Sequence, residues 1–242
     1  TRPCLLGMNN KLKRIMATLI APTVDLPPQL QTLTNLADTR IGAKVLECSD
    51  DFFADAQRML QFAAPVFVED KFDNHGKWMD GWETRRKRHA GYDWAIVQLG
   101  VAGKIQALDI DTTFFSGNYP ASASVEACYA PQGNLAPAEW QPLLANSILG
   151  PSQHHLFEVS SDAVYTHVRL NIFPDGGVAR FRVYGEVKIQ TTDHQGTLDL
   201  LALENGGRVI AYSDAHCGHP RNLINPGRSI NMGDGWETKR RR

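Results

Sequence analysis

The chain has 242 residues and a net charge of −1, with 25 lysines and arginines against 26 aspartates and glutamates, and 43% of its residues are hydrophobic. This composition is ordinary for a soluble globular protein of one or two domains, and it provides enough apolar material for a sizeable core. The chain lacks the excess of basic residues that marks a duplex-binding surface, so we expect no nucleic-acid partner.

Residues 1–30 are expected to form an N-terminal extension ahead of the first domain. The segment KLKRIMATLIAPTV (11–24) places basic residues before an apolar run, as a signal peptide does. The run is too short to span a membrane, and no small-residue cleavage site follows it cleanly. The chain begins with Thr1, so either Met8 or Met16 could be the natural start. We therefore expect neither a membrane partner nor secretion.

The cysteines are scattered along the chain and form no CxxC pair; they are Cys4, Cys48, Cys128 and Cys217. A disulfide framework would be denser, and a zinc site would need closer spacing and more ligands. This pattern indicates reduced cysteines in a cytoplasmic protein, and we expect no metal.

Residues 31–190 are expected to form a first domain made of short β-strands. The candidate strands are DWAIVQL (93–99), KIQALDIDTTFF (104–115), SVEACY (124–129) and HLFEVS (155–160). The glycines of GVAGK (100–104) predict a turn between the first two strands. Only Phe52–Phe62 has a helical pattern. Many short strands joined by turns predict an all-β, antiparallel β-sandwich of the jelly-roll type.

The clearest predicted hairpin is THVRLNIF-PDGG-VARFRVYG (166–185). Residues 168, 170 and 172 in the first arm, and 179, 181 and 183 in the second, are apolar and alternate with polar positions. This period of two predicts one buried and one polar face, with PDGG as the turn. Arg169, Arg180 and Arg182 would then share the polar face, where a solvated surface is the default interpretation.

A nine-residue phrase occurs twice, as DGWETRRKR (80–88) and as DGWETKRRR (234–242). KVLECSDDFF (44–53) is likewise echoed by RVIAYSDAHC (208–217), so landmarks recur in the same order. This indicates a duplicated domain whose second copy, 191–242, is incomplete.

The two copies of the phrase agree on arginine at some positions and not at others. Arg86 and Arg88 recur as arginines, whereas Arg85 is replaced by Lys239. A guanidinium offers a planar fork to a carboxylate, which an ammonium cannot. One interpretation is a ligand site; the other is a structural ion-pair ladder in which Asp80 and Glu83 satisfy the arginines.

The segment DIDTTFFSGNYP (109–120) ends a predicted strand with Asp111 and Thr112, followed by two aromatic residues and a turn at Asn118. Polar groups beside aromatics at a strand end suit the pocket of a small polar ligand. The alternative is a capped loop with Phe114 and Phe115 in the core. Two histidine motifs, His154-His155 and HCGH (216–219), are better explained as loops than as metal sites.

Taken together, KVLECSDDFF, DGWETRRKR, GYDWAIVQLG, DIDTTFFSGNYP and NIFPDGGVARFRVYG resemble the allantoicase family. The resemblance runs from about residue 35 to the end of the chain and implies two galactose-binding-like jelly-roll repeats. It also implies hydrolysis of allantoate, a small-molecule substrate, to ureidoglycolate and urea, without a cofactor. We further expect a homo-oligomer.

Allantoate carries one carboxylate and two ureido groups, so arginines and carboxylates are the side chains expected at its site. The catalytic candidates are Asp80, Glu83 and Asp111. The candidates for substrate binding are Arg86, Arg88, Trp82, Thr112, Asn118, Arg169, Arg180 and Arg182. Their equivalents in the second copy are Asp234, Glu237, Arg240 and Arg242. The alternatives are a non-catalytic carbohydrate-binding module, which would show exposed Trp and Tyr instead, or an inactive fragment of the enzyme.

Overall fold

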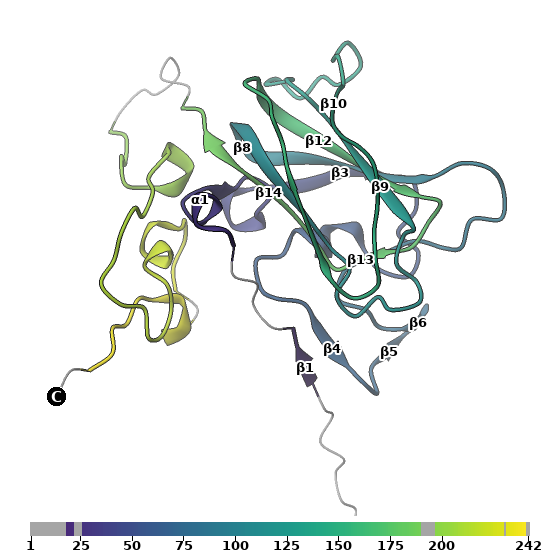
Figure 1. Cartoon of the computed structure of the whole chain (residues 1–242), viewed down its shortest axis with the longest axis horizontal. Helices are drawn as coiled ribbons and strands as arrows, with labels where there is room; N and C mark the ends of the chain where they lie inside the picture. The colour runs from purple at the N-terminus through teal and green to yellow at the C-terminus, as the bar shows by residue number, and fades with distance from the viewer. Residues whose placement is uncertain (1–17, 22–25, 190–196, 230, 241–242) are drawn as a thin grey trace, which may run out of the picture.

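A computed structural model describes residues 18–21, 26–189, 197–229 and 231–240. Its main sheet has the strand order β10-β9-β12-β8-β14-β2, with β3 and β11 also paired to β8. The strands are β2 (Thr34–Asn35), β3 (Lys44–Cys48), β8 (Asp93–Asp111), β9 (Ser122–Cys128), β10 (Gln141–Ile148), β11 (His154–Glu158), β12 (Val164–Phe173) and β14 (Arg180–Val187). Every strand pair is antiparallel, so the predicted all-β antiparallel fold is confirmed. Figure 1 shows these strands in one body, with the segment from residue 197 onward beside it on the left of the view.

Strand β8 belongs to both layers of the sandwich that this one eight-stranded sheet forms, and these layers are called its two sheets below. Its first half pairs with β3 and β12, and its second half pairs with β11 and β14. The turn predicted at GVAGK is therefore wrong, because β8 continues through it. A Cβ at Gly100 would lie 2.5 Å from the carbonyl oxygen of Ile41, and one at Gly103 would lie 2.6 Å from that of Glu186. These glycines permit close backbone contact where the strand passes from one sheet to the other.

The predicted hairpin of residues 166–185 is also wrong. Strand β12 pairs with β8 and β9, whereas β14 pairs with β8 and β2, so the two arms never pair with each other. Instead, PDGG leads into β13 (Gly177–Val178), which pairs with β7 (Trp82–Glu83). The predicted buried residues are confirmed: Val168, Leu170, Ile172, Phe181 and Val183 are all fully buried. Alternation fixes which face of a strand is apolar, but it does not fix the partner strand.

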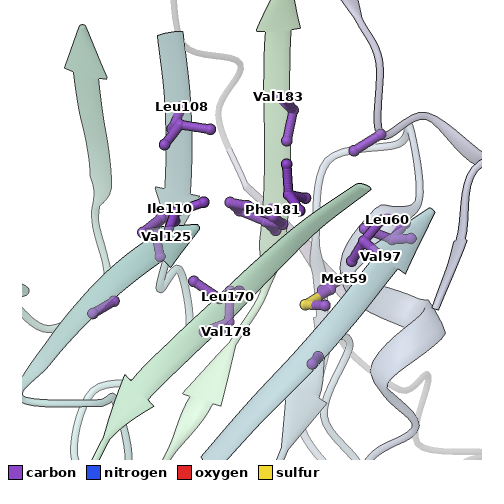
Figure 2. Close-up of a cluster of buried hydrophobic side chains, with 14 of the residues drawn as sticks. Met59, Leu60, Val97, Leu108, Ile110, Val125, Leu170, Val178, Phe181 and Val183 are labelled. Atoms are coloured by element: carbon purple, nitrogen blue, oxygen red, sulfur yellow. The ribbon is translucent and has the colours of Figure 1, made fainter. Parts of the chain in front are cut away.

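The core lies between the two sheets that β8 joins. Val97 from the first half of β8 and Leu108 and Ile110 from its second half belong to one buried cluster. Figure 2 shows the side chains of these residues directed into a common interior with Phe181 and Leu170. Full burial of an aliphatic or aromatic side chain contributes about 1.5–3 kcal/mol to stability. The fold is thus a sandwich, as the sequence predicts.

Helical structure is confined to single turns in the part of the chain that the structure describes. The helical pattern predicted for 52–62 is confirmed in part by a 3-10 helix at Ala56–Leu60, capped by the Asp55 carboxylate, which accepts from Gln57 N at 2.8 Å. Helix α1 (Pro28–Gln31) is equally short. None of the described helices has the length and hydropathy needed to cross a bilayer. The remaining strands form small ribbons, β1 (Thr18–Ile20) with β4 (Val66–Val68) and β5 (Phe72–Asp73) with β6 (Gly76–Lys77).

The described part of the second copy is mostly irregular chain with three 3-10 helices: Leu203–Asn205, Pro220–Ile224 and Met232–Asp234. It packs on the first copy through Leu203 and Ile224, which contact Ile41 in a small buried cluster. The two copies therefore share an interface, and that interface contributes to the site described next.

Candidate functional site

The repeated phrase builds the same local structure in both copies. The indole N–H of Trp82 donates to the carbonyl oxygen of Asp50 at 2.8 Å, and that of Trp236 donates to the carbonyl oxygen of Asp214 at 2.8 Å. Trp82 is completely buried. This candidate for substrate binding is therefore placed as a core anchor, with no surface left for a ligand.

A second repeated contact explains why lysine can replace arginine in the phrase. The backbone N–H of Arg85 donates to Asp50 Oδ2 at 2.6 Å, and the backbone N–H of Lys239 donates to Asp214 Oδ2 at 2.6 Å. Because the backbone makes the shared contact, the side chain at this position is free to vary. The arginine adds a side-chain hydrogen bond to Asp50 in the first copy.

The ion-pair ladder predicted within the phrase is wrong. Asp80 pairs with Arg180 at 2.7 Å, and Glu83 accepts from the amide of Asn118 at 2.6 Å. Only Trp82–Glu83 is a strand, and the chain beyond it turns outward, so the acids and the bases of the phrase face different surroundings. Arg86 and Arg88 are exposed, and neither pairs with another described residue.

Glu83 and Asn118 are two predicted residues that the fold does bring together. Burial raises the pKa of the Glu83 carboxyl, the hydrogen bond from Asn118 opposes that effect, and the charge of Asp73 adds to it, so the pKa is raised overall. A carboxyl with a raised pKa is a candidate to donate and accept a proton, as a general acid or base must.

Arg180 and Asp80 lie together in the interior. Arg180 is completely buried, and its guanidinium also donates to the carbonyl oxygen of Ala63 at 2.8 Å. Asp80 Oδ2 additionally accepts from the backbone N–H of Val66 at 2.9 Å. The pair thus fixes the segment 63–66 against the sheet, and this segment forms one wall of the cavity described below.

Four charged or titratable side chains meet on the outer face of β8, β11 and β14. The register places Asp111 opposite both His154 and Arg180, and Asp109 opposite Arg182. His154 Nδ1 lies 2.9 Å from Asp109 Oδ2, and its Nε2 lies 3.5 Å from Asp111 Oδ2. Arg182 Nη1 lies 3.4 Å from Asp109 Oδ2 and 3.8 Å from Asp111 Oδ2. We call Asp109, Asp111, His154 and Arg182 the acidic-histidine cluster.

The electrostatics of this cluster favour a protonated histidine. Burial lowers the pKa of His154, but the hydrogen bond and charge of Asp109 and the charge of Asp111 outweigh burial, so the pKa is raised above 6.5. Asp111 Oδ1 accepts from Thr113 N, whereas its buried Oδ2 has no hydrogen-bond partner. The cluster therefore combines a histidine whose charged form is stabilised with a buried carboxyl oxygen that accepts no hydrogen bond.

A cavity of about 270 Å³ opens onto the cluster between the two copies. Its walls come from the sheet face, from the segment 62–65 and from the second copy. The residues lining it are Leu26, Asn35, Phe62, Ala63, Ala64, Pro65, Asp109, His154, Arg182, Tyr184 and Arg221. Arginines and a carboxylate at one pocket are the feature expected of an allantoate site.

The other predicted residues lie elsewhere. Thr112 is buried and its hydroxyl donates to the carbonyl oxygen of Gly150 at 2.7 Å, which is a structural contact. Arg169 pairs with Glu126 across β12 and β9. The expectation that Arg169, Arg180 and Arg182 share one face is therefore wrong, because β12 and β14 flank different halves of β8.

In the second copy, Glu237 and Arg240 line an open cavity of about 550 Å³ together with Asp214. Asp234 ends a 3-10 helix. Arg242 lies outside the described residues. No group of three or more His, Cys, Asp or Glu side chains among the described residues is arranged to hold a metal ion.

Sequence reasoning missed Asp109, His154 and Arg221. The spacing of Asp109 and Asp111 was a usable signal, since residues two apart on a strand share a face. His154 was interpreted as part of a loop, but it opens β11. Arg221 carried no signal, because it reaches the cavity only through the packing of the second copy on the first.

Comparison with known proteins places these features in a family. The model of the allantoicase repeat matches twice, at residues 34–188 and 198–242, which confirms the duplication. A probable allantoicase of Acinetobacter baylyi is 78% identical over 227 residues, which cover 94% of this chain and 68% of the relative. One of Photobacterium profundum is 53% identical over 86% of this chain and 64% of the relative.

Among solved structures, the allantoicase of Saccharomyces cerevisiae is similar, with a TM-score of 0.73 and 39% sequence identity. The similarity covers 87% of this chain and 64% of the yeast chain. The chain thus spans about two thirds of the length of the proteins it matches.

Proposed function

The chain belongs to the allantoicase family, and from this premise we propose that it hydrolyses allantoate to ureidoglycolate and urea. We place the reaction at the acidic-histidine cluster, which lies at the floor of the cavity between the two copies. A cavity of about 270 Å³ suits a small polar molecule.

Arg182 is the proposed partner for the substrate carboxylate within this cluster. Its distances of 3.4 and 3.8 Å to the two aspartates are longer than ordinary N–H···O hydrogen bonds, so its donors are not saturated. A guanidinium binds a carboxylate through paired hydrogen bonds, which a lysine at this place could not form.

His154 is the proposed general acid. Water attacks the central carbon of allantoate, the new C–O bond forms as the C–N bond to one ureido group breaks, and His154 protonates the departing nitrogen. The proton lost by the water passes to a carboxylate of the cluster, Asp109 or Asp111. No covalent intermediate is required, and a positioned acid of this kind contributes about 10²–10⁴-fold to the rate.

Glu83, Asn118, Arg86 and Arg88 are the second candidate site for the same reaction, as the sequence predicts. The raised pKa of Glu83 and its hydrogen bond from Asn118 support it. The same acid recurs in the second copy as Glu237, beside an open cavity. The contacts of Asp80, to the backbone of Val66 and to Arg180, are structural and give no support to a catalytic role.

The test is urea release from allantoate, measured on this chain and on the Acinetobacter baylyi relative as a positive control. His154→Gln should lower kcat by about 10²-fold or more, and Glu83→Gln should leave it within a few-fold. The reverse order would move the reaction to the Glu83 site. Retained allantoate binding without any urea release by the folded chain would favour the alternative, a non-catalytic binding module.

We also propose a cytoplasmic homo-oligomer. The cysteines Cys48, Cys128 and Cys217 are unpaired, which supports a reducing compartment. Strand β10 ends the main sheet, and its Ile148 side chain is 86% exposed, which supports contact with another subunit at this edge. Light scattering on the purified chain tests the oligomeric state.

A further inference from the structure

We propose that Arg221, which the second copy contributes to the cavity, is the specificity-determining anchor for the carboxylate of the bound ureide. The inference deepens the proposed function and rests on it for the identity of the substrate. It assigns to the second copy a direct part in a site whose other charged residues all come from the first copy.

Arg221 is a charged side chain that lacks an anionic partner among the described residues. Its guanidinium is partly buried, and its Nη2 donates to the carbonyl oxygen of Gln31, but it forms no ion pair with any described residue. Burial lowers the pKa of Arg221; Tyr184 opposes this effect, the charge of Arg40 adds to it and the charge of Asp38 opposes it, so the pKa is lowered overall. A desolvated charge without a counter-ion is costly, and an anionic ligand at this place would compensate it.

The cavity provides room for that anion beside the cluster. Arg221 lines it together with Arg182 and His154, so a ligand there meets up to three positive groups against the single lining carboxylate of Asp109. A second cavity of about 270 Å³ shares Leu26, Phe62 and Arg221 with the first. Arg221 therefore lies between two adjacent cavities and is exposed to a ligand in either of them.

The two ends of the ligand would bind to different residues. One end of the ligand, the carboxylate, lies between Arg221 and Arg182, and the ureido end lies toward the aspartates. A ureide with a carboxylate on the adjacent carbon should bind, and a neutral ureide of similar size should bind much more weakly. This selectivity distinguishes a carboxylate anchor from an arginine that only holds the two copies together.

The experiment measures calorimetric binding of hydantoate, which carries one ureido group and one carboxylate, and of the neutral N-propylurea to the whole chain. Wild type is compared with Arg221→Gln, Arg221→Lys and the control Arg208→Gln. Arg208 is an exposed arginine of the same segment that pairs with Glu186 at 3.4 Å. Thermal unfolding of each variant is recorded in parallel.

Arg221→Gln should weaken hydantoate binding roughly ten- to a hundredfold, as expected for a lost charged hydrogen bond, with no change for N-propylurea. Arg221→Lys should restore part of the affinity, and Arg208→Gln should bind as wild type does. Absence of hydantoate binding to wild type, equal binding by the Arg221→Gln and Arg208→Gln variants, or equal losses for both ligands would overturn the proposal. If Arg221→Gln does not fold, Arg221→Lys decides: undiminished hydantoate affinity in it would also count against the anchor.

Binding of hydantoate through Arg221 by a chain that releases no urea from allantoate would separate the two claims. The carboxylate anchor would then stand, and the proposed hydrolysis would fail.

Discussion

Arg180 donates from Nη2 to Asp80 Oδ2 at 2.7 Å, and the side chain of the arginine is completely inaccessible to solvent. Three further N–H groups of the guanidinium donate to the carbonyl oxygens of Ala63, Ala179 and Asp80. An arginine buried so deeply is tolerable because it has a carboxylate counter-ion and three carbonyl acceptors around it.

Asp80→Ala should therefore destabilise the fold strongly, because it leaves the buried charge of Arg180 without its counter-ion. We expect a loss of about 3–5 kcal/mol in the free energy of unfolding, measured by urea denaturation. Lys104→Gln is the control, since it breaks the exposed pair of Lys104 and Asp162 and should cost less than about 1 kcal/mol. Similar losses in the two variants would contradict the assignment.

Gly177→Ala should destabilise the fold where β13 begins. A Cβ at Gly177 would lie 2.0 Å from Cδ1 of the buried Phe115, so the ring would have to move. Overpacking of this kind costs about 1–3 kcal/mol. Gly117→Ala is the matched control, because a Cβ there meets nothing within 4 Å. Thermal melts of the two variants give the comparison, and equal melting temperatures would refute the close contact.

His154 should make stability depend on pH in a defined direction. Its pKa is raised in the folded chain, so its contribution is complete below the unfolded value of 6.5 and is lost as pH rises through the higher folded value. His154→Gln should consequently destabilise the chain more at pH 5.5 than at pH 8.5. Unfolding measurements across this range test it, and a larger cost at high pH would reverse the sign.

His167 provides an internal comparison for that titration. Burial lowers the pKa of His167, so by NMR its ring should titrate below 6.5 while that of His154 titrates above it. Asp109→Asn should move the His154 titration downward and leave His167 unchanged, because Asp109 supplies the hydrogen bond and the largest charge effect on His154. An unmoved His154 would show that Asp109 is not its partner in solution.

The repeated phrase should tolerate a change at its exposed Arg86, but not the loss of the Asp50 carboxylate that accepts from its backbone. Arg86→Lys should leave the melting temperature unchanged, since Arg86 is exposed and pairs with no described residue. Asp50→Ala removes the acceptor of the Arg85 backbone N–H and should cost about 1–3 kcal/mol. Asp214→Ala should cost less, because Lys239 contributes only its backbone contact. A destabilised Arg86→Lys variant would restore the ladder that the structure rejects.

The sequence predicts the strands of this fold better than their partners. Alternation identified the buried residues of β12 and β14 because burial depends on the local period of two. It could not show that β8 lies between the two strands, because a turn such as PDGG closes a hairpin and leads to another sheet with equal ease. The glycines of β8 misled for a related reason: Gly100 and Gly103 make room for neighbouring backbone rather than for a turn.

The candidate site was predictable only in part. Asp111 and Arg182 were found because acids and arginines on strands attract attention in any sequence. His154 could join them only once β11 was known to pair with the end of β8, and Arg221 only once the second copy was in place. Conversely, the many charged residues of the repeated phrase suggested more functional side chains than the structure supports, since several of these residues hold the loop in place.

The shared strand β8 has a consequence for how the molecule comes apart. Because one continuous segment supplies hydrogen bonds to both layers, neither layer can detach while the other stays intact. The sandwich should open as a single cooperative unit, and amide hydrogens on both sides of Gly100 and Gly103 should exchange at the rate of global unfolding. The bend that lets β8 serve both sheets thereby ties the end of the strand that carries Asp109 and Asp111 to the stability of the whole domain, so the cluster would keep its geometry until the domain itself unfolds.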